Sequence, residues 1–374
     1  MSAERLLATF IDLVRIDSPS GLEAALAGHC ASQLEDIGFS VHFDTSAAFT
    51  GSNTGNLIAE LPGTRPGAPV LLLSAHLDCV EPCRGVEPVV RDGVVFAAGE
   101  TVLGADDKAG IAAILEGVRR VIEGGADRGK VRVILTVGEE CGLKGAKALD
   151  PADVAADLCL VLDADGEPGG IVIGAPSHHT FVAEFSGTAA HAGVAPEEGR
   201  SALLMAAHAV TGMQLGRLDD QTTANVGTVE GGTATNVVPA RVTMTGECRS
   251  LDPDRVLEVR ASMDVAMKDA SESLGGDVEV RWTKEYEAFR TAQDAPIIGL
   301  LSRACSDVGL QPRLFTTGGG SDGSIFAELG VPTLVLSCGM RSVHSSEERI
   351  AIADLESLSR LVEATIVRFA ESRT

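Results

Sequence analysis

Short apolar segments alternate with amphipathic helical patterns up to about residue 175, and this alternation restricts the fold more than any other feature. Strands are predicted near 55–61, 70–75, 131–137 and 158–162, with a helix over 107–123. Because these strands are mostly apolar, helices must cover both faces of the sheet that they form. In sheets of this kind, ligands are bound beyond the carboxyl ends of the strands.

A second pattern interrupts the first between residues 179 and 289. Segments such as TFVAEFSG and DVEVRW alternate between apolar and polar residues, and two helical segments separate such strands. The resulting order β-α-β-β-α-β is that of a ferredoxin-like sandwich. We therefore predict an α/β/α domain formed by residues 1–178 and 290–374, and an inserted α+β domain at residues 179–289.

Charge and composition exclude several classes of protein. The 374 residues carry a formal net charge of -23, which argues against nucleic acid or an anionic membrane as a partner. No apolar run approaches the ~20 residues that a membrane span requires. The eight cysteines include no CxxC pair, and the first residues read as an amphipathic helix and not as a signal peptide. The sequence therefore predicts a cytoplasmic protein.

Five short segments place histidine or acidic residues at the ends of predicted strands or in loops. They are SAHLDC (His76, Asp78), LGADDKAG (Asp106, Asp107), GEECG (Glu139, Glu140), LDADGEPG (Asp163, Asp165) and VHSSEE (His344). Together they supply a mixed set of imidazole and carboxylate ligands, which suits zinc and other divalent ions. The His-x-Asp form of the first segment also lets a carboxylate orient the imidazole from behind.

The segment VILTVGEECG ends an apolar strand on two adjacent glutamates. Two like charges at the end of a buried strand cost energy unless a cation lies between them. A bridging carboxylate would let two ions sit ~3.5–4 Å apart and share a hydroxide, as in two-metal aminopeptidases. Glu140 would then bind a metal, and Glu139 would act as the general base.

These segments, in this order, resemble the M20 family of zinc metallopeptidases, particularly its peptidase T-like branch of aminopeptidases. The resemblance spans almost the whole chain and includes GTAAHAG, GGTATNVVPARV and GGGSDGSIFAELGVP. It implies a zinc-exopeptidase-like catalytic domain of the α/β/α type. It also implies that the inserted domain serves as a lid and dimerisation domain.

The resemblance further implies a role for each site residue. The metal ligands are His76, Asp106, Glu140, Asp163 and His344, with Asp165 as the alternative to Asp163. Asp106 bridges two ions through a cis Asp106-Asp107 bond, Asp78 lies behind His76, and Glu139 is the base. In the inserted domain, His191 stabilises the oxyanion from its own or a partner subunit, and Asn236 and Arg249 hold the polar or carboxylate ends of the substrate.

The sequence thus predicts an exopeptidase with two zinc ions, or with cobalt or manganese in their place, that releases N-terminal residues from tripeptides. A dipeptidase or carboxypeptidase and an N-acyl-amino-acid amidohydrolase remain alternatives, since the same family uses one metal centre for all of them. A metal-dependent binding protein without turnover is the alternative outside hydrolysis. The expected partner is a short peptide, with a homodimer through the inserted domain possible.

Two other hydrolase classes fit less well. GGSDG at residues 319–323 matches the G-x-S-x-G nucleophile elbow, but only Asp322 and Glu328 lie between Ser321 and His344 to serve as its acid. The M42 aminopeptidase family has its inserted domain between the first histidine and the bridging aspartate. His76 and Asp106 stand too close in the sequence for that arrangement.

Overall fold

The computed structural model describes residues 2–372, and the chain divides into two compact units. The larger unit consists of Met1–Ile173, Thr291–Thr316 and Ser321–Thr374, and the inserted unit consists of Gly174–Arg290 and Thr317–Gly320. The larger unit therefore contains segments from both sides of the insertion.

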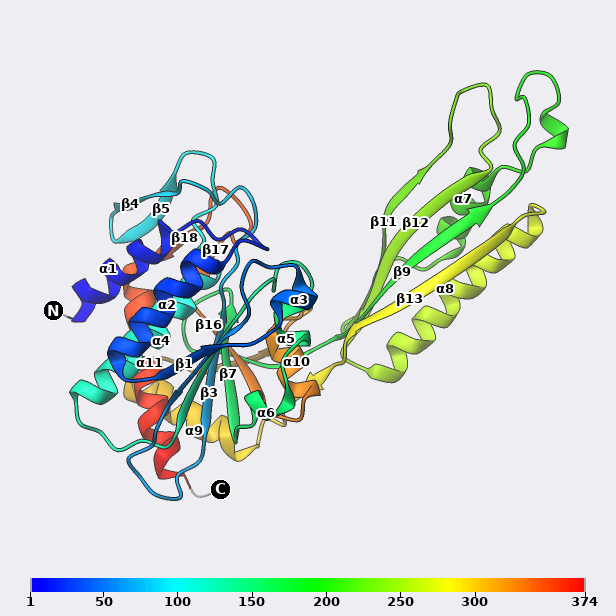
Figure 1. Cartoon of the computed structure of the whole chain (residues 1–374). Helices are drawn as coiled ribbons and strands as arrows, with labels where there is room; N and C mark the ends of the chain where they lie inside the picture. Colours follow the sequence, from blue (N-terminus) through cyan, green and yellow to red (C-terminus); the bar gives the residue numbers. More distant parts are fainter. Residues whose placement is uncertain (1, 373–374) are drawn as a thin grey trace. The chain divides into compact units, whose positions relative to one another are not determined.

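A mixed sheet forms the centre of the larger unit (Figure 1). Its strands are β1 Ser40–Phe43, β2 Leu57–Leu61, β3 Leu71–His76, β6 Val131–Thr136, β7 Leu158–Ala164, β8 Gly170–Ala175, β15 Arg313–Thr316 and β16 Thr333–Ser337. They follow the order β1-β2-β6-β3-β7-β16-β8, with β15 beside β8. From β6 to β16 neighbouring strands are parallel, so their carboxyl ends lie at one edge.

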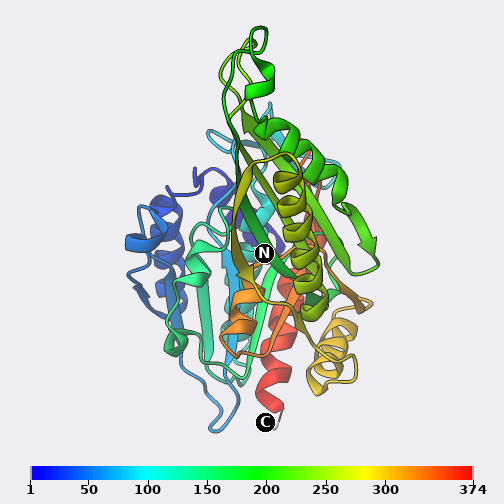
Figure 2. The same ribbon diagram turned by 90° about the vertical axis from the view of Figure 1, so that its right-hand side faces the viewer.

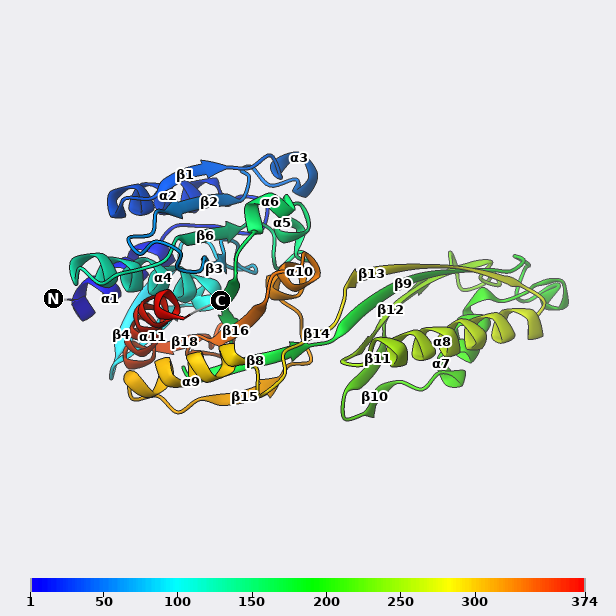
Figure 3. The same ribbon diagram turned by 90° about the horizontal axis from the view of Figure 1, so that it is seen from below.

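Helices cover both faces of this sheet, as predicted (Figure 3). One face carries α1 Ser2–Val14, α2 Ala24–Ile37, α4 Ala105–Glu123, α9 Pro296–Asp307 and α11 Ile352–Glu371. The other face carries the short helices α3 Ala47–Thr50, α5 Lys144–Lys147, α6 Pro151–Val154 and α10 Asp322–Glu328. Every residue of β3 and β6 is buried, which explains why both strands are mostly apolar in sequence.

A small sheet of order β17-β18-β5-β4 lies elsewhere in the larger unit. The hairpin of β4 Glu87–Arg91 and β5 Val94–Ala98 turns at Asp92 and Gly93. Both turn residues have positive φ, 50° and 75°, which matches the twist of paired strands and favours glycine. β17 Met340–Arg341 and β18 Arg349–Ala351 pair with each other, and the loop between them carries His344.

The inserted unit is a ferredoxin-like sandwich with an added edge strand. Its elements are β9 Ser177–Ser186, the 3-10 turn η1 Pro196–Glu198, α7 Ala202–Gly212, β10 Gly216–Asp219, β11 Thr222–Gly231, β12 Arg241–Ser250, α8 Pro253–Ser273 and β13 Asp277–Tyr286. The two-residue strand β14 Phe289–Arg290 pairs with β8 and is not part of this sandwich. The sheet order is β10-β11-β12-β9-β13, and α7 and α8 pack on one face (Figure 2). Without β10, this is the predicted β-α-β-β-α-β arrangement.

Each unit has its own hydrophobic core. In the larger unit, apolar residues of α1, α4 and α11 pack with those of the central strands. In the inserted unit, Phe181 and Phe185 of β9 pack with Met205 of α7 and Met263 of α8. The predicted fold class is therefore confirmed.

Candidate metal centre

The predicted metal ligands lie at the carboxyl edge of the central sheet. β3 ends at His76, Asp163 stands one residue before the end of β7, and Glu140 follows the end of β6 after a short turn. Asp106 lies in the first turn of α4, which packs against β3 and β7. The parallel strands thus bring together side chains that are far apart in the sequence.

One half of the cluster surrounds His76, which is almost fully buried. Its Nε2 atom is 3.1 Å from Asp106 Oδ1 and 3.5 Å from Asp163 Oδ1. Asp165 is exposed to solvent, whereas Asp163 lies beside the imidazole. The geometry therefore favours Asp163 over Asp165 as a ligand in this half.

The other half of the cluster surrounds His344. Its Nε2 atom is 2.9 Å from Glu140 Oε1 and 3.3 Å from Asp106 Oδ2. Asp106 therefore directs one carboxylate oxygen toward each histidine. The Asp106-Asp107 peptide bond is cis, as the family resemblance implied.

Three acids of the cluster, Asp163, Glu139 and Asp106, have shifted pKa values. Burial raises the pKa of Asp163 to about 7 and raises that of Glu139 well above its usual range. Burial also opposes ionisation of Asp106, but the imidazoles of His344 and His76 hold its pKa below the ordinary value. The protein therefore supplies too little positive charge around these carboxylates. They cannot all be ionised at neutral pH.

A divalent cation fits this set of donors. One ligand atom from each of His76, Asp106 and Glu140 lies within 4.8 Å of the others, and the same is true of His76, Asp107 and Asp163. Imidazole nitrogen and carboxylate oxygen are the ligands that zinc, cobalt and manganese accept. The charge of a cation would also offset the cost of burying an ionised Asp163, which is what raises the pKa of this carboxyl.

Comparison with known proteins assigns the chain to a family. Residues 72–368 match peptidase family M20/M25/M40. The chain belongs to the M20 peptidase family. An uncharacterized protein, YqjE, of Bacillus subtilis (strain 168) is 38% identical over 371 residues, which cover 99% of this chain and 100% of that protein. The predicted family and the prediction of a hydrolytic enzyme are confirmed.

Two solved structures are similar to this M20 peptidase over nearly its whole length. The aminopeptidase PepT of Bacillus cereus ATCC 10987 is 39% identical, with a TM-score of 0.93 over 98% of this chain and 99% of that one. A tripeptidase of Staphylococcus aureus subsp. aureus Mu50 is 36% identical, with a TM-score of 0.95 over 99% of each chain. The peptidase T-like branch is thus represented among the relatives.

The Asp78 carboxylate lies beside Nδ1 of His76 and also contacts the loop of the two glutamates. Nδ1 of His76 lies 2.8 Å from the backbone oxygen of Asp78 and 3.5 Å from its carboxylate. The carboxylate also accepts the backbone N–H groups of Glu139 and Glu140 and the hydroxyl of Ser20. Asp78 therefore stands behind the imidazole and holds the loop of the two glutamates through its side chain.

The predicted substrate-binding residues lie in the inserted unit. His191 and Asn236 are exposed on neighbouring loops, joined by a 2.9 Å hydrogen bond from the N–H of Ala192 to the backbone oxygen of Asn236. Arg249 in β12 donates through Nε and Nη2 to Glu247, at 3.0 and 2.9 Å. The structure thus brings together the loops of His191 and Asn236, while an acid fixes the guanidinium of Arg249.

Two further acids belong to the cluster although the sequence did not single out their roles. Asp107 is fully buried, accepts the backbone N–H of His76 at 3.2 Å, and has its pKa raised well above the usual value by burial. Glu348 accepts the N–H groups of Gly104 and Asp106 at 2.7 and 2.9 Å. Both acids stand in recognised motifs. The sequence pattern, however, does not distinguish an acid that binds a metal from one that accepts backbone N–H groups.

The GGSDG segment carries a helix cap. Ser321 is the N-cap of α10, and its Oγ accepts the N–H of Gly323 at 3.2 Å. Asp322 is buried and accepts the hydroxyl of Thr136, and burial raises its pKa to about 6. Capping therefore accounts for the serine without a nucleophile elbow.

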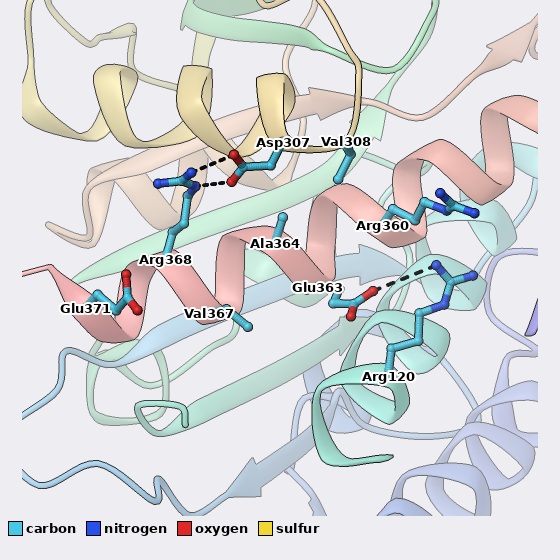
Figure 4. A pocket seen from close by; sticks show the side chains of 9 residues that line it. All are labelled: Arg120, Asp307, Val308, Arg360, Glu363, Ala364, Val367, Arg368 and Glu371. Carbon is cyan, nitrogen blue, oxygen red and sulfur yellow. Dashed lines mark hydrogen bonds and ion pairs between the residues drawn. The ribbon is translucent and has the colours of Figure 1, made fainter. Parts of the chain in front are cut away.

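A pocket of about 680 Å³ lies between α4, α9 and α11 of the larger unit (Figure 4). None of the predicted site residues lines it. Arg368 pairs with Asp307, Arg360 pairs with Glu356, and Arg120 pairs with Glu116. Because its arginines already have acidic partners, this pocket offers no evident ligand site.

Proposed function

We propose that this M20 peptidase is a two-zinc aminopeptidase that releases N-terminal residues from tripeptides. The observation that carries the proposal is the position of Asp106, whose two carboxylate oxygens face His76 and His344. A bridging carboxylate of this kind is typical of two-metal hydrolases. The names of the two similar solved structures, an aminopeptidase and a tripeptidase, support this substrate class.

The proposed ligands are His76, Asp106, Glu140, Asp163 and His344. Bound cations would supply Lewis acidity toward the scissile carbonyl and toward water. Glu139 takes a proton from the attacking water on its carboxylate and later donates it to the leaving amine. The raised pKa of Glu139 suits a group that must both accept and return a proton.

The inserted unit supplies the proposed contacts with the substrate. His191 donates a hydrogen bond to the developing oxyanion, in its own subunit or in a partner of a homodimer. Arg249 and Asn236 hold the polar or carboxylate ends of the peptide. Glu247 supports this role of Arg249, since the bidentate pair fixes the plane of the guanidinium, whose Nη1 donates to the backbone oxygen of Gly318 at 3.4 Å.

We also propose that the peptidase acts in the cytoplasm on short peptides. In the part of the chain that the structure describes, no helix has the length and apolar character needed to cross a membrane. The formal net charge of -23 supports a partner other than nucleic acid or an anionic membrane.

Two measurements test this function. The first is a screen of free, N-blocked and C-amidated di- and tripeptides with the zinc-loaded protein. Cleavage that survives amidation but not N-blocking is the expected result, whereas the reverse would indicate a carboxypeptidase or an N-acyl-amino-acid amidohydrolase. Cleavage of dipeptides alone would indicate a dipeptidase.

The second measurement uses the substitution Glu139→Gln. It should lower kcat by roughly 10²–10⁴-fold while zinc binding is retained, because Gln cannot carry the proton. The matched control is Glu371→Gln, a surface change at the end of α11, which should leave kcat unaltered. Normal turnover by the Glu139→Gln protein would refute the role of Glu139 as the base.

A further inference from the structure

Side chains from earlier in the chain hold the loop that carries Glu139 and Glu140. β6 ends at Thr136, so the backbone N–H groups of residues 137–140 lie beyond the strand. The four donor and acceptor pairs are Val137 to Asn56 Oδ1 at 3.1 Å, Gly138 to Glu23 Oε1 at 3.1 Å, Glu139 to Asp78 Oδ1 at 2.9 Å and Glu140 to Asp78 Oδ2 at 3.2 Å. Three side chains thus satisfy four consecutive donors.

Glu23 is the one charged member of this set that lies outside the recognised motifs, since Asn56 is neutral and Asp78 belongs to SAHLDC. It is fully buried and stands at the N-cap of α2, but its side chain makes no capping hydrogen bond. Asn53 accepts the first helical N–H, that of Ala24, at 2.9 Å. The carboxylate of Glu23 is therefore free to reach across to the loop.

The contacts of Glu23 fix it firmly in that position. Oε1 accepts the N–H groups of Gly21 at 2.8 Å and of Gly138 at 3.1 Å, and Oε2 accepts the hydroxyl of Ser52. Hydrogen bonds to a carboxylate are about twice as strong as those between neutral groups. Without it, the N–H groups of Gly21 and Gly138 would be left without this acceptor, and a buried donor without a partner is costly.

We propose that Glu23 is a positioning residue for Glu139, a role that rests on the proposed function of Glu139 as the base. Gly138 has a φ of 60°, so the chain turns at this residue as it leaves β6. The bond from Glu23 anchors the peptide unit at the turn, directly before the base. Glu23 thereby fixes the direction in which the Glu139 side chain leaves the sheet.

The experiment compares Glu23→Ala and Glu23→Gln in the full-length, zinc-loaded protein. Glu23→Ala removes both acceptor atoms and should lower kcat for a tripeptide by about 10–100-fold, since a displacement of about 1 Å can cost ~10²-fold. KM should change by less than about 2-fold, because the carboxylate has no role in substrate binding. Glu23→Gln keeps Oε1 as an acceptor and can donate to Ser52, so it should recover kcat to within about 3-fold of the wild type.

Arg132→Met is the matched control for a loss of stability. Arg132 is buried at the opposite end of β6, where it donates to the backbone oxygens of Asp153 and Ala155 at 2.6 and 2.9 Å. Its loss should lower the unfolding temperature without changing kcat. Amide hydrogen exchange over residues 137–142 supplies a readout that does not depend on turnover, and it should be faster in Glu23→Ala than in Arg132→Met.

Each outcome decides the inference. Unchanged kcat and unchanged exchange in Glu23→Ala would overturn it, as would an equal loss of kcat in Glu23→Gln or in Arg132→Met. If the wild-type protein cleaves no peptide, the proposed function fails, and the exchange rates then decide the inference alone. Faster exchange at residues 137–142 in Glu23→Ala, restored in Glu23→Gln, would still support the anchoring of the loop.

Discussion

Removal of divalent cations should make the protein less stable as the pH rises from 5 to 8. Burial raises the pKa of Asp163 from an ordinary 3.8 to about 7. A carboxyl whose pKa is higher in the folded state contributes stability that is complete below the unfolded pKa and is lost as the pH rises through the folded pKa. The raised pKa of His76 acts in the same direction, whereas the lowered pKa of Asp106 acts only below about pH 4.

The size of this effect follows from the shift. Three pKa units correspond to about 4 kcal/mol, of which roughly 3 kcal/mol falls between pH 5 and pH 8. For a domain of this size, each kcal/mol shifts Tm by about 2–4 °C. The Tm of the metal-free protein should therefore fall by roughly 6–12 °C between pH 5 and pH 8. Zinc should raise Tm by most of this amount at pH 8. At pH 5 it should raise Tm much less, because protons compete for the same oxygens.

The assay is thermal unfolding of the chelator-treated protein at pH 5 and pH 8, with and without zinc. Asp163→Asn supplies the matched variant, because it removes the titrating group at nearly constant volume. It should flatten the pH dependence of the metal-free protein and reduce the gain from zinc at pH 8. A metal-free protein that is equally stable, or more stable, at pH 8 would refute the electrostatic argument for the metal centre.

Three further perturbations test other parts of the structure. Gly320→Ala should lower the free energy of unfolding of the inserted unit by about 1–3 kcal/mol in urea, since the added Cβ would clash with the Tyr286 ring. The pKa of Glu247 is lowered to about 2, so this carboxylate contributes stability above pH 4.5 that is lost as the pH falls toward 2. Glu247→Gln should lower the free energy of unfolding by roughly 1–2 kcal/mol, allowing for the partial exposure of the carboxylate. Trp282 fluorescence would report the acid unfolding. His344→Ala should weaken zinc binding by at least about 10–100-fold in a chelator competition.

Controls and contrary outcomes are available for each of these. Gly319→Ala meets nothing closer than 3.8 Å and should leave stability nearly unchanged, so an equal loss there would contradict the steric argument. His208→Ala, at an exposed position of α7, should leave zinc affinity as it is. Acid unfolding that is identical with and without the Glu247 carboxylate would show that its ion pair contributes nothing to stability.

The sequence predicted the elements of the site because each is marked locally. The apolar run of β6 and the glutamates after it are contiguous, and parallel strands necessarily gather such ends at one edge. The hairpin at Asp92 and Gly93 was predictable for the same reason, since two residues determine the turn. The family resemblance then supplied the roles that local patterns could not.

The remaining features depend on hydrogen-bond partners that are distant in sequence. The His-x-Asp pattern places Asp78 beside His76, but it does not show that the same carboxylate also accepts N–H groups about 60 positions later in the chain. Glu23 stands at an ordinary helix start, and its position there does not indicate which loop it will reach. The edge strand β10 is short and partly exposed, so it lacks the apolar alternation that identifies a strand.

The placement of β16 between β7 and β8 has a consequence for biosynthesis. β16 and the His344 loop are made after the inserted unit, yet they complete a sheet whose other central strands precede it. A nascent chain that has emerged only as far as residue 290 would therefore hold an interrupted sheet and four of the five proposed ligands, without His344. Loading with cations should be a late event on the ribosome, and a chain truncated before His344 should hold at most the ion beside His76.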